Sequence, residues 1–290
     1  MSRGDTPAST SKRPSLVLGC FGVALVLIIT AGVVGVAWLR QQRQIAPLPF
    51  ETRCVATGPS GSVSLTLDQS RWTAIVVGMG VRHQVGVHGA TIAMATVYQE
   101  TGIRNLEYGD RDSLGLFQQR PSQDWGTPEQ IMDPWYSSEQ FYEALVEVPG
   151  WKTGDVNDTA QAVQRSGHPQ AYRKHEQNAR VLAEAFTGEA IDGVSCFDER
   201  RVAGRPAELG AEITRTFGDP VTQDGSRLEI VPGDAARARA VAAYAIANAG
   251  EFGVTSVETG GRTWTASQTG LPSWQAGGDV PEGTSVITLR

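Results

Sequence analysis

The segment from residue 90 to residue 125 constrains the fold of this chain more than any other. It begins as an apolar, alanine-rich run that predicts a buried helix ending at a single carboxylate, Glu100. An acid at the end of an apolar helix is partly removed from water, and desolvation raises the pKa of a carboxyl group. We therefore expect Glu100 to hold a proton near neutral pH and to donate it to a leaving group. The alternative is a solvated glutamate that only closes a helix.

The same segment carries two motifs that together resemble a known family. The sequence Gln99-Glu100-Thr101 is followed, after a charged and turn-rich loop, by Gly115-Leu116-Phe117-Gln118. This pair is similar to the Glu-Ser and Gly-Leu-Met-Gln motifs of the soluble lytic transglycosylase and goose-type lysozyme superfamily. A third family element, Ala-Tyr-Asn-x-Gly, keeps only its glycine here, because the chain reads Val163-Gln164-Arg165-Ser166-Gly167. The resemblance covers about residues 67–186, and the departure at residues 163–166 leaves the substrate, and the activity itself, open.

The resemblance implies a mainly α lysozyme-like domain, about residues 65–197, in which Glu100 is the catalytic acid. It also implies that the loop after this helix borders the substrate cleft. Gln118 and Gln119 would bind N-acetyl groups and Trp125 would stack on a sugar ring; otherwise they are exposed amides and a buried indole. The residues expected to bind substrate are Gly115, Leu116, Phe117, Gln118, Gln119, Trp125 and Gln164.

Acidic residues crowd the loop between Glu100 and the Gly-Leu-Phe-Gln motif, and three interpretations stay open. In the first interpretation they are solvated loop charges. In the second, Asp110 or Asp112 is a second carboxylate, which orients a water molecule or stabilises positive charge on the sugar. In the third interpretation they bind calcium, although the spacing of an EF-hand loop is absent. No zinc-protease motif, phosphate-binding loop or nucleophilic serine elbow occurs, so we expect neither a metal nor a cofactor.

The N-terminal region predicts a membrane anchor. Residues 1–14 are polar and are expected to be a disordered cytoplasmic tail, and residues 15–39 are apolar and uncharged. A helix of that length rises about 36 Å, enough to cross a lipid bilayer. The rival interpretation is a cleaved signal peptide, but no small-residue cleavage site follows the run. Residues 40–64, rich in proline and glycine, are expected to be a linker.

Two cysteines bracket the lysozyme-like region. A disulfide between Cys54 and Cys196 would close a loop of about 142 residues and requires an oxidising compartment. The alternative is two unrelated buried thiols. A disulfide agrees with domains that lie outside the cytoplasm.

The C-terminal residues, 205–290, predict a small α+β domain. Asp234 is placed to cap an alanine-rich helix, and the sequence Thr259-Gly260-Gly261 is typical of a hairpin turn. Trp264 and Trp274 could form a sugar- or peptide-binding face, although a core role is favoured. This domain is also where a cell-envelope protein partner could bind.

Taken together, the sequence predicts a single-pass protein of the bacterial cell membrane, with a cytoplasmic N-terminus. Its extracytoplasmic lysozyme-like domain would cleave peptidoglycan glycan strands, as a lytic transglycosylase or as a hydrolase. The alternative is a non-catalytic cell-wall-binding or scaffold protein with a degenerate lysozyme-like fold. The formal net charge is −6 and no basic stripe stands out, so nucleic acid is not an expected partner.

Overall fold

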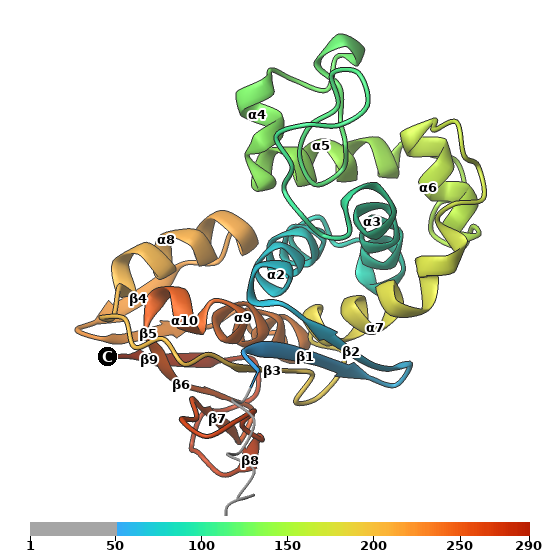
Figure 1. Cartoon of the computed structure of the whole chain (residues 1–290). Coiled ribbons are helices and arrows are strands. Elements are labelled where there is room, and N and C mark those ends of the chain that lie inside the picture. The colour runs from blue at the N-terminus through green and yellow to red at the C-terminus, as the bar shows by residue number, and fades with distance from the viewer. Residues whose placement is uncertain (1–50) are drawn as a thin grey trace, which may run out of the picture. The chain divides into compact units, whose positions relative to one another are not determined.

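Two antiparallel sheets and a disulfide organise residues 51–290, the part of the chain that the computed structural model describes (Figure 1). The prediction of a mainly α fold is wrong for these residues. The structure is a mixture of helices and sheets, because short segments far apart in the sequence pair as strands.

Among residues 51–290, no helix has the length and apolar character needed to cross a bilayer. The longest of them, α2 (Leu67–Arg82) and α3 (Gly86–Thr101), have 16 residues each, and a span requires about 20. The predicted single-pass transmembrane helix is not among the helices of residues 51–290. The predicted tail, residues 1–14, and the predicted span, residues 15–39, lie outside the described residues.

The first sheet has three strands in the order β2-β1-β3. Strands β1 (Arg53–Gly58) and β2 (Gly61–Leu65) form a hairpin, and β3 (Val194–Phe197) pairs with the free edge of β1. Cys54 and Cys196 lie opposite each other in this register and form the predicted disulfide. The hairpin occupies residues that were expected to belong to the linker. Glu184 of α7 (Glu176–Phe186) accepts two hydrogen bonds from Ser60 in the hairpin turn.

The helical part lies between β2 and β3 in the sequence. Helix α2 begins with a capping box formed by Thr66 and Gln69, and it packs against α3. Helix α3 packs along α7, and α6 lies on another side of it (Figure 1). The remaining elements of this part are α4 (Pro128–Met132), α5 (Pro134–Val146), α6 (Val156–Gln164), α7 (Glu176–Phe186) and the 3₁₀ turns η1 (Pro121–Gln123) and η2 (Arg173–His175).

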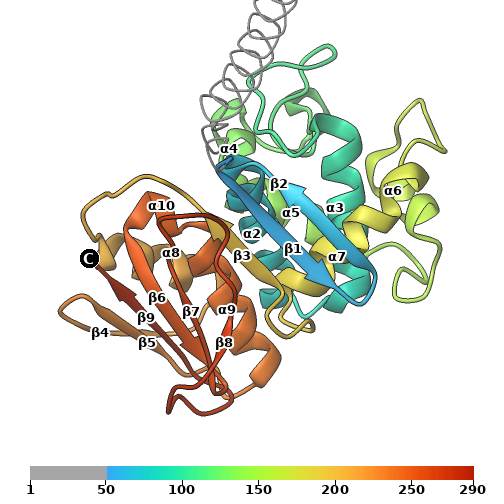
Figure 2. The same ribbon diagram turned by 60° about the horizontal axis from the view of Figure 1, so that its bottom comes forward.

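The second sheet has six strands in the order β4-β5-β9-β6-β7-β8 (Figure 2). The predicted hairpin is confirmed, since Thr259 pairs with Arg262 across two glycines of positive φ. The predicted cap is also confirmed, because the Asp234 side chain accepts a hydrogen bond from the Arg237 backbone at the start of α9. The elements are α8 (Pro206–Phe217), β4 (Val221–Asp224), β5 (Arg227–Ile230), α9 (Ala235–Ala247), α10 (Ala249–Phe252), β6 (Val254–Thr259), β7 (Arg262–Thr265), β8 (Gln275–Ala276) and β9 (Ser285–Leu289).

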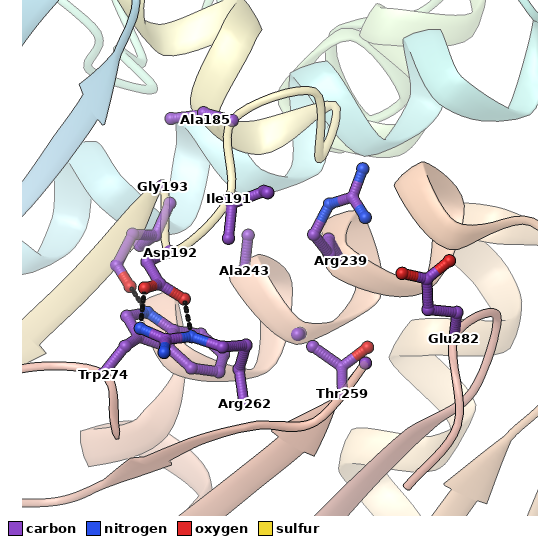
Figure 3. A pocket seen from close by; sticks show the side chains of 14 residues that line it. Ala185, Ile191, Asp192, Gly193, Arg239, Ala243, Thr259, Arg262, Trp274 and Glu282 are labelled. Atoms are coloured by element: carbon purple, nitrogen blue, oxygen red, sulfur yellow. Dashed lines mark hydrogen bonds and ion pairs between the residues drawn. The ribbon is translucent and has the colours of Figure 1, made fainter. Parts of the chain in front are cut away.

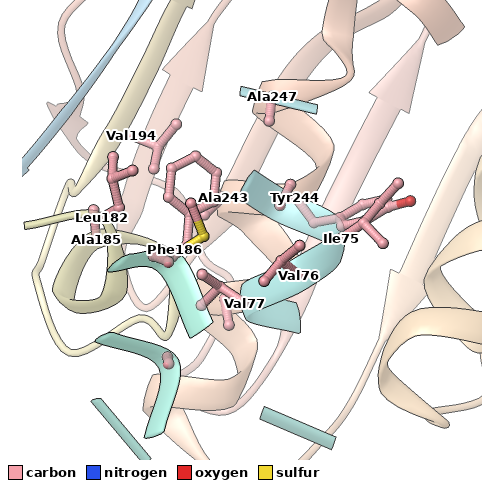
Figure 4. Packing of buried hydrophobic residues seen from close by; sticks show 14 of the residues in the cluster. Ile75, Val76, Val77, Leu182, Ala185, Phe186, Val194, Ala243, Tyr244 and Ala247 are labelled. Atoms are coloured by element: carbon pink, nitrogen blue, oxygen red, sulfur yellow. The ribbon is translucent and has the colours of Figure 1, made fainter. Parts of the chain in front are cut away.

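The helical part and the second sheet share one hydrophobic core. Helix α9 packs against the sheet on one side and against α2 on the other, so Ile75 and Val76 meet Ala243 and Tyr244 (Figure 4). A polar network also crosses this junction: Arg71 donates to Asn248 and Glu212, and Tyr244 donates to Glu212 at 2.8 Å. Residues 51–290 consequently form one compact unit.

The disulfide yields a first prediction. Replacing Cys54 and Cys196 together with serine should lower the free energy of unfolding by about 2 to 5 kcal/mol, because the bond closes a long loop. Urea titrations followed by circular dichroism measure the change. Reducing agent should destabilise the wild type and leave the double variant unaffected; equal stability of the two oxidised proteins would contradict the prediction.

Candidate functional site

Helix α3 presents Glu100 at its C-terminal end. Most of the helix is buried, and Gly102 ends it in the left-handed conformation, with φ of 64°. The neighbouring Thr101 is buried, and its hydroxyl lies 3.1 Å from the carbonyl oxygen of Leu116. The same hydroxyl accepts a hydrogen bond from the backbone N–H of Arg104. Thr101 therefore fixes the end of the helix against the Gly-Leu-Phe-Gln segment.

The Gly-Leu-Phe-Gln segment is a tight turn packed into the core. Gly115 has φ of 75°, and a Cβ at this position would lie 2.7 Å from the carbonyl oxygen of Ile131, so only glycine fits. The side chains of Leu116 and Phe117 are fully buried, and Phe117 stacks on Phe141 with ring centroids 4.6 Å apart. The side chains of Leu116 and Phe117 therefore belong to the core. The contact of Phe117 with Gln164 is made by its backbone carbonyl oxygen.

The two glutamines after Phe117 have different surroundings. Gln118 adopts a positive φ of 51°, and its amide lies 3.3 Å from the carbonyl oxygens of Tyr108 and Gly115. Gln119 is buried and donates to the carbonyl of Ser137 at 3.0 Å. Gln119 is therefore a structural amide, whereas Gln118 is partly exposed beside the loop.

Glu100 is held by two side chains that come from the other end of the helical part. Tyr172 donates its hydroxyl to Oε1 of Glu100 at 2.8 Å. Nε2 of Gln164 lies 3.5 Å from the same oxygen and 2.7 Å from the carbonyl oxygen of Phe117. Oε2 of Glu100 has no hydrogen-bond partner among residues 51–290. One carboxylate oxygen is thus fixed by hydrogen bonds and the other is not.

Burial raises the pKa of Glu100 above its usual range. Hydrogen bonds from Tyr172 and Gln164, and the charge of His168, act in the opposite direction but do not cancel the effect of burial. Burial also raises the pKa of Tyr172, so its hydroxyl keeps its proton and acts as a donor. This environment shifts the balance toward protonated Glu100, which is the direction that a general acid requires.

Tyr172 is the site residue that sequence reasoning missed. Buried Asn157 of α6 positions Tyr172 through two hydrogen bonds. The amide nitrogen of Asn157 donates to the carbonyl of Pro169, and the amide oxygen of Asn157 accepts from the backbone N–H of Arg173. These two bonds fold residues 165–173 back toward α3. The sequence predicts a helix over residues 171–186 with Tyr172 on its inward face, which does not distinguish Tyr172 from a core residue. The helix begins only at Glu176.

A groove lies beside Gln164 and has a volume of about 570 Å³. Trp125 and Val148 form part of its wall, and Gln164 and Arg165, at the end of α6, form another part. Gln164 therefore belongs to both the groove and the surroundings of Glu100. Trp125, a predicted sugar-stacking residue, lies where a ligand in this groove would meet it.

The two acids considered as a second carboxylate do not join this site by any hydrogen bond. Asp112 forms an ion pair with Arg120 at 2.7 Å and accepts from the backbone of Ser122 at 2.8 Å. The bonds from Ser122 and Arg120 hold the pKa of Asp112 well below its usual range, so it is ionised and fixes the loop. The Asp110 side chain is 93 % exposed. In the part of the chain that the structure describes, no cluster of three or more histidine, cysteine or acidic residues could hold a metal.

No known family model matches the chain, and no curated protein matches it either. The resemblance to the lytic transglycosylase superfamily therefore depends on the motifs at residues 99–101 and 115–118 and on the geometry that connects them.

The burial of Glu100 predicts a pH-dependent effect on stability. A carboxyl group whose pKa is higher in the folded than in the unfolded state stabilises the fold below its unfolded pKa, and this contribution is lost as the pH rises through the folded pKa. Glu100→Gln keeps an oxygen for Tyr172 and carries no charge. At pH 7 to 8 it should therefore unfold a few degrees above the wild type, and the gap should narrow toward pH 4.

Thermal unfolding between pH 4 and pH 8, followed by circular dichroism, measures this gap. Glu107→Gln, which removes an exposed acid from the adjacent loop, is the matched control. A gap that stays constant with pH, or that widens as the pH falls, would show that Glu100 is not a desolvated acid.

Proposed function

We propose that this protein is a peptidoglycan-cleaving enzyme of the lytic transglycosylase type, with Glu100 as its general acid and base. The observation that carries the proposal is the environment of the carboxyl group. Burial favours its protonated form, Tyr172 fixes one oxygen, and the other oxygen has no hydrogen-bond partner among residues 51–290. Gln164, which lies next to this carboxyl group, also lines a groove. The substrate would be the glycosidic bond between N-acetylmuramic acid and N-acetylglucosamine.

In the first step, Glu100 donates its proton to the glycosidic oxygen as the bond to C1 breaks. Positive charge then builds on the muramic acid ring. The Glu100 carboxylate formed in this step is stabilised by the hydroxyl of Tyr172 and, more weakly, by the amide of Gln164. Donors that strengthen as charge develops lower the barrier to proton transfer.

In the second step, the 6-hydroxyl of the same muramic acid attacks C1 and gives its proton to Glu100. The product is a 1,6-anhydro end, and the acid is restored without water. One carboxyl group suffices for both steps. This route agrees with the state of Asp112, which is occupied by Arg120 and Ser122, and with the full exposure of Asp110. A hydrolase would need one of these acids to activate a water.

The disulfide supports a location outside the cytoplasm, where such bonds persist and where peptidoglycan lies.

The residue at position 165, an arginine, supports the second candidate function, a non-catalytic wall-binding protein. Gln164 and Arg165 stand in place of the family's Tyr-Asn pair, and Gln164 bonds to the Phe117 carbonyl close to Glu100. In that case the groove would bind glycan without cleaving it.

The acid role predicts the outcome of a digestion assay. The purified full chain, incubated with peptidoglycan, should release 1,6-anhydro-muropeptides that mass spectrometry identifies. Glu100→Gln cannot donate a proton and should lower the rate by about 10² to 10⁴. Glu107→Gln, in the exposed loop nearby, should retain the wild-type rate.

The products distinguish the alternatives. Reducing muropeptide ends without the anhydro group would indicate hydrolysis. Saturable binding to peptidoglycan without release of any fragment, by the wild type and by Glu100→Gln alike, would establish a binding protein and refute the enzyme.

The hydrogen bond from Tyr172 predicts a shift in the pH profile. This bond lowers the pKa of Glu100, so Tyr172→Phe should raise it. Activity requires protonated Glu100 and declines as the pH rises through the pKa of this group. The alkaline limb of the rate profile should therefore move to higher pH in Tyr172→Phe, while the maximal rate falls. An unmoved or acid-shifted limb would exclude this role for Tyr172.

A further inference from the structure

A second cavity lies between the end of α7, helix α9 and the β6–β7 hairpin (Figure 3). It has a volume of about 140 Å³ and shares no lining residue with the groove beside Gln164. The segment after α7 contributes Ile191 and Asp192, and α9 contributes Arg239 and Ala243. Trp274 and Glu282 complete the wall.

The inner part of this cavity is apolar and open because small side chains line it. Four alanines and a valine from α7, the segment after it, α9 and the start of β3 form this surface, namely Ala185, Ala190, Ala242, Ala243 and Val194. The whole cavity, at about 140 Å³, is close in volume to an apolar cavity of about 150 Å³ that accommodates benzene. It therefore has room for one aliphatic or small aromatic side chain of a ligand.

The charged groups around the cavity are not all paired. Asp192 and Arg262 form an ion pair and neutralise each other. Arg239 donates from Nε to the carbonyl of Gly188 at 2.6 Å, and its two terminal nitrogens have no partner among residues 51–290. Glu282 likewise forms no ion pair within these residues, and it stands on the same side of the cavity as Arg239 (Figure 3).

The bond to Gly188 orients the guanidinium group of Arg239. With Nε engaged, the two terminal nitrogens form the fork that binds a carboxylate through two parallel hydrogen bonds. Glu282 adds an acceptor for a positive group. The combination of a cationic fork, an anion and an apolar hollow is complementary to an amino acid.

We infer that this cavity binds the α-carboxylate of an amino acid that has an apolar side chain. The carboxylate lies on Arg239, and the side chain enters the alanine-lined hollow beside Trp274. The ligand is either a free amino acid, whose ammonium group meets Glu282, or the C-terminal residue of a peptide, which has no such group. The inference does not depend on the chemistry proposed for Glu100.

Isothermal titration of the full chain tests this site with four probes: leucine, N-acetylleucine, N-acetylleucinamide and inorganic phosphate. At least one of the two carboxylates should bind saturably. The amide, which lacks the anion, and phosphate, which lacks the side chain, should bind at least about tenfold more weakly. Arg239→Gln should weaken carboxylate binding by a similar factor, and Arg201→Gln, at an exposed arginine that lines no part of the cavity, should not.

A variant at the exposed edge of the cavity keeps the test valid if Arg239→Gln does not fold. Ile191 lines the cavity but is 68 % exposed, so Ile191→Asp should fold and repel a carboxylate, whereas Ile191→Asn should bind more tightly than Ile191→Asp. Tighter binding of leucine than of N-acetylleucine, lost in Glu282→Gln, assigns the free amino acid. The reverse order assigns a peptide C-terminus. Binding of the amide as tight as that of the acids, or no saturable binding of any probe, overturns the inference.

Discussion

The hydrogen bond between Tyr172 and Glu100 is the contact on which the candidate site depends. It joins the end of α3 to the segment between α6 and α7, so the two sides of the site have a fixed separation. Gln164 reinforces the junction by bonding to the Phe117 carbonyl. The candidate site is built by elements from across the helical part. The β1–β3 pairing with its disulfide ties the two ends of that part together.

Features set by local sequence could be predicted. The helix that ends at Glu100, the cap at Asp234 and the hairpin at residues 259–262 each depend on a few neighbouring residues. The disulfide could also be predicted, because the number and spacing of the cysteines left few alternatives. At the candidate site, the motif singled out Glu100 as the candidate acid. The structure adds that Glu100 is partly buried and that burial raises its pKa.

Features set by pairing across the chain could not be predicted. Strand β1 was expected to be linker, because its short sequence lies among prolines and glycines, and its partner β3 is 142 residues away at the disulfide. The shared core was equally hidden, since the alanines of α9 do not reveal that the helix is covered on both sides by α2 and the sheet. Tyr172 depends on buried Asn157, whose two bonds to the following loop have no signature in the sequence.

Glu100 and Asp112 show how one fold gives two carboxyl groups opposite properties. Asp112 receives an arginine and a backbone N–H in solvent, so the charged form is favoured and the group serves the structure of the loop. Glu100 is buried, and its donors only moderate the effect of desolvation. A catalyst that gives a proton in one step and takes it back in the next requires such a balance, because a group that is strongly biased toward either form slows one of the two steps. In the proposed mechanism, the Tyr172 bond contributes to that balance because it offsets part of the effect of burial.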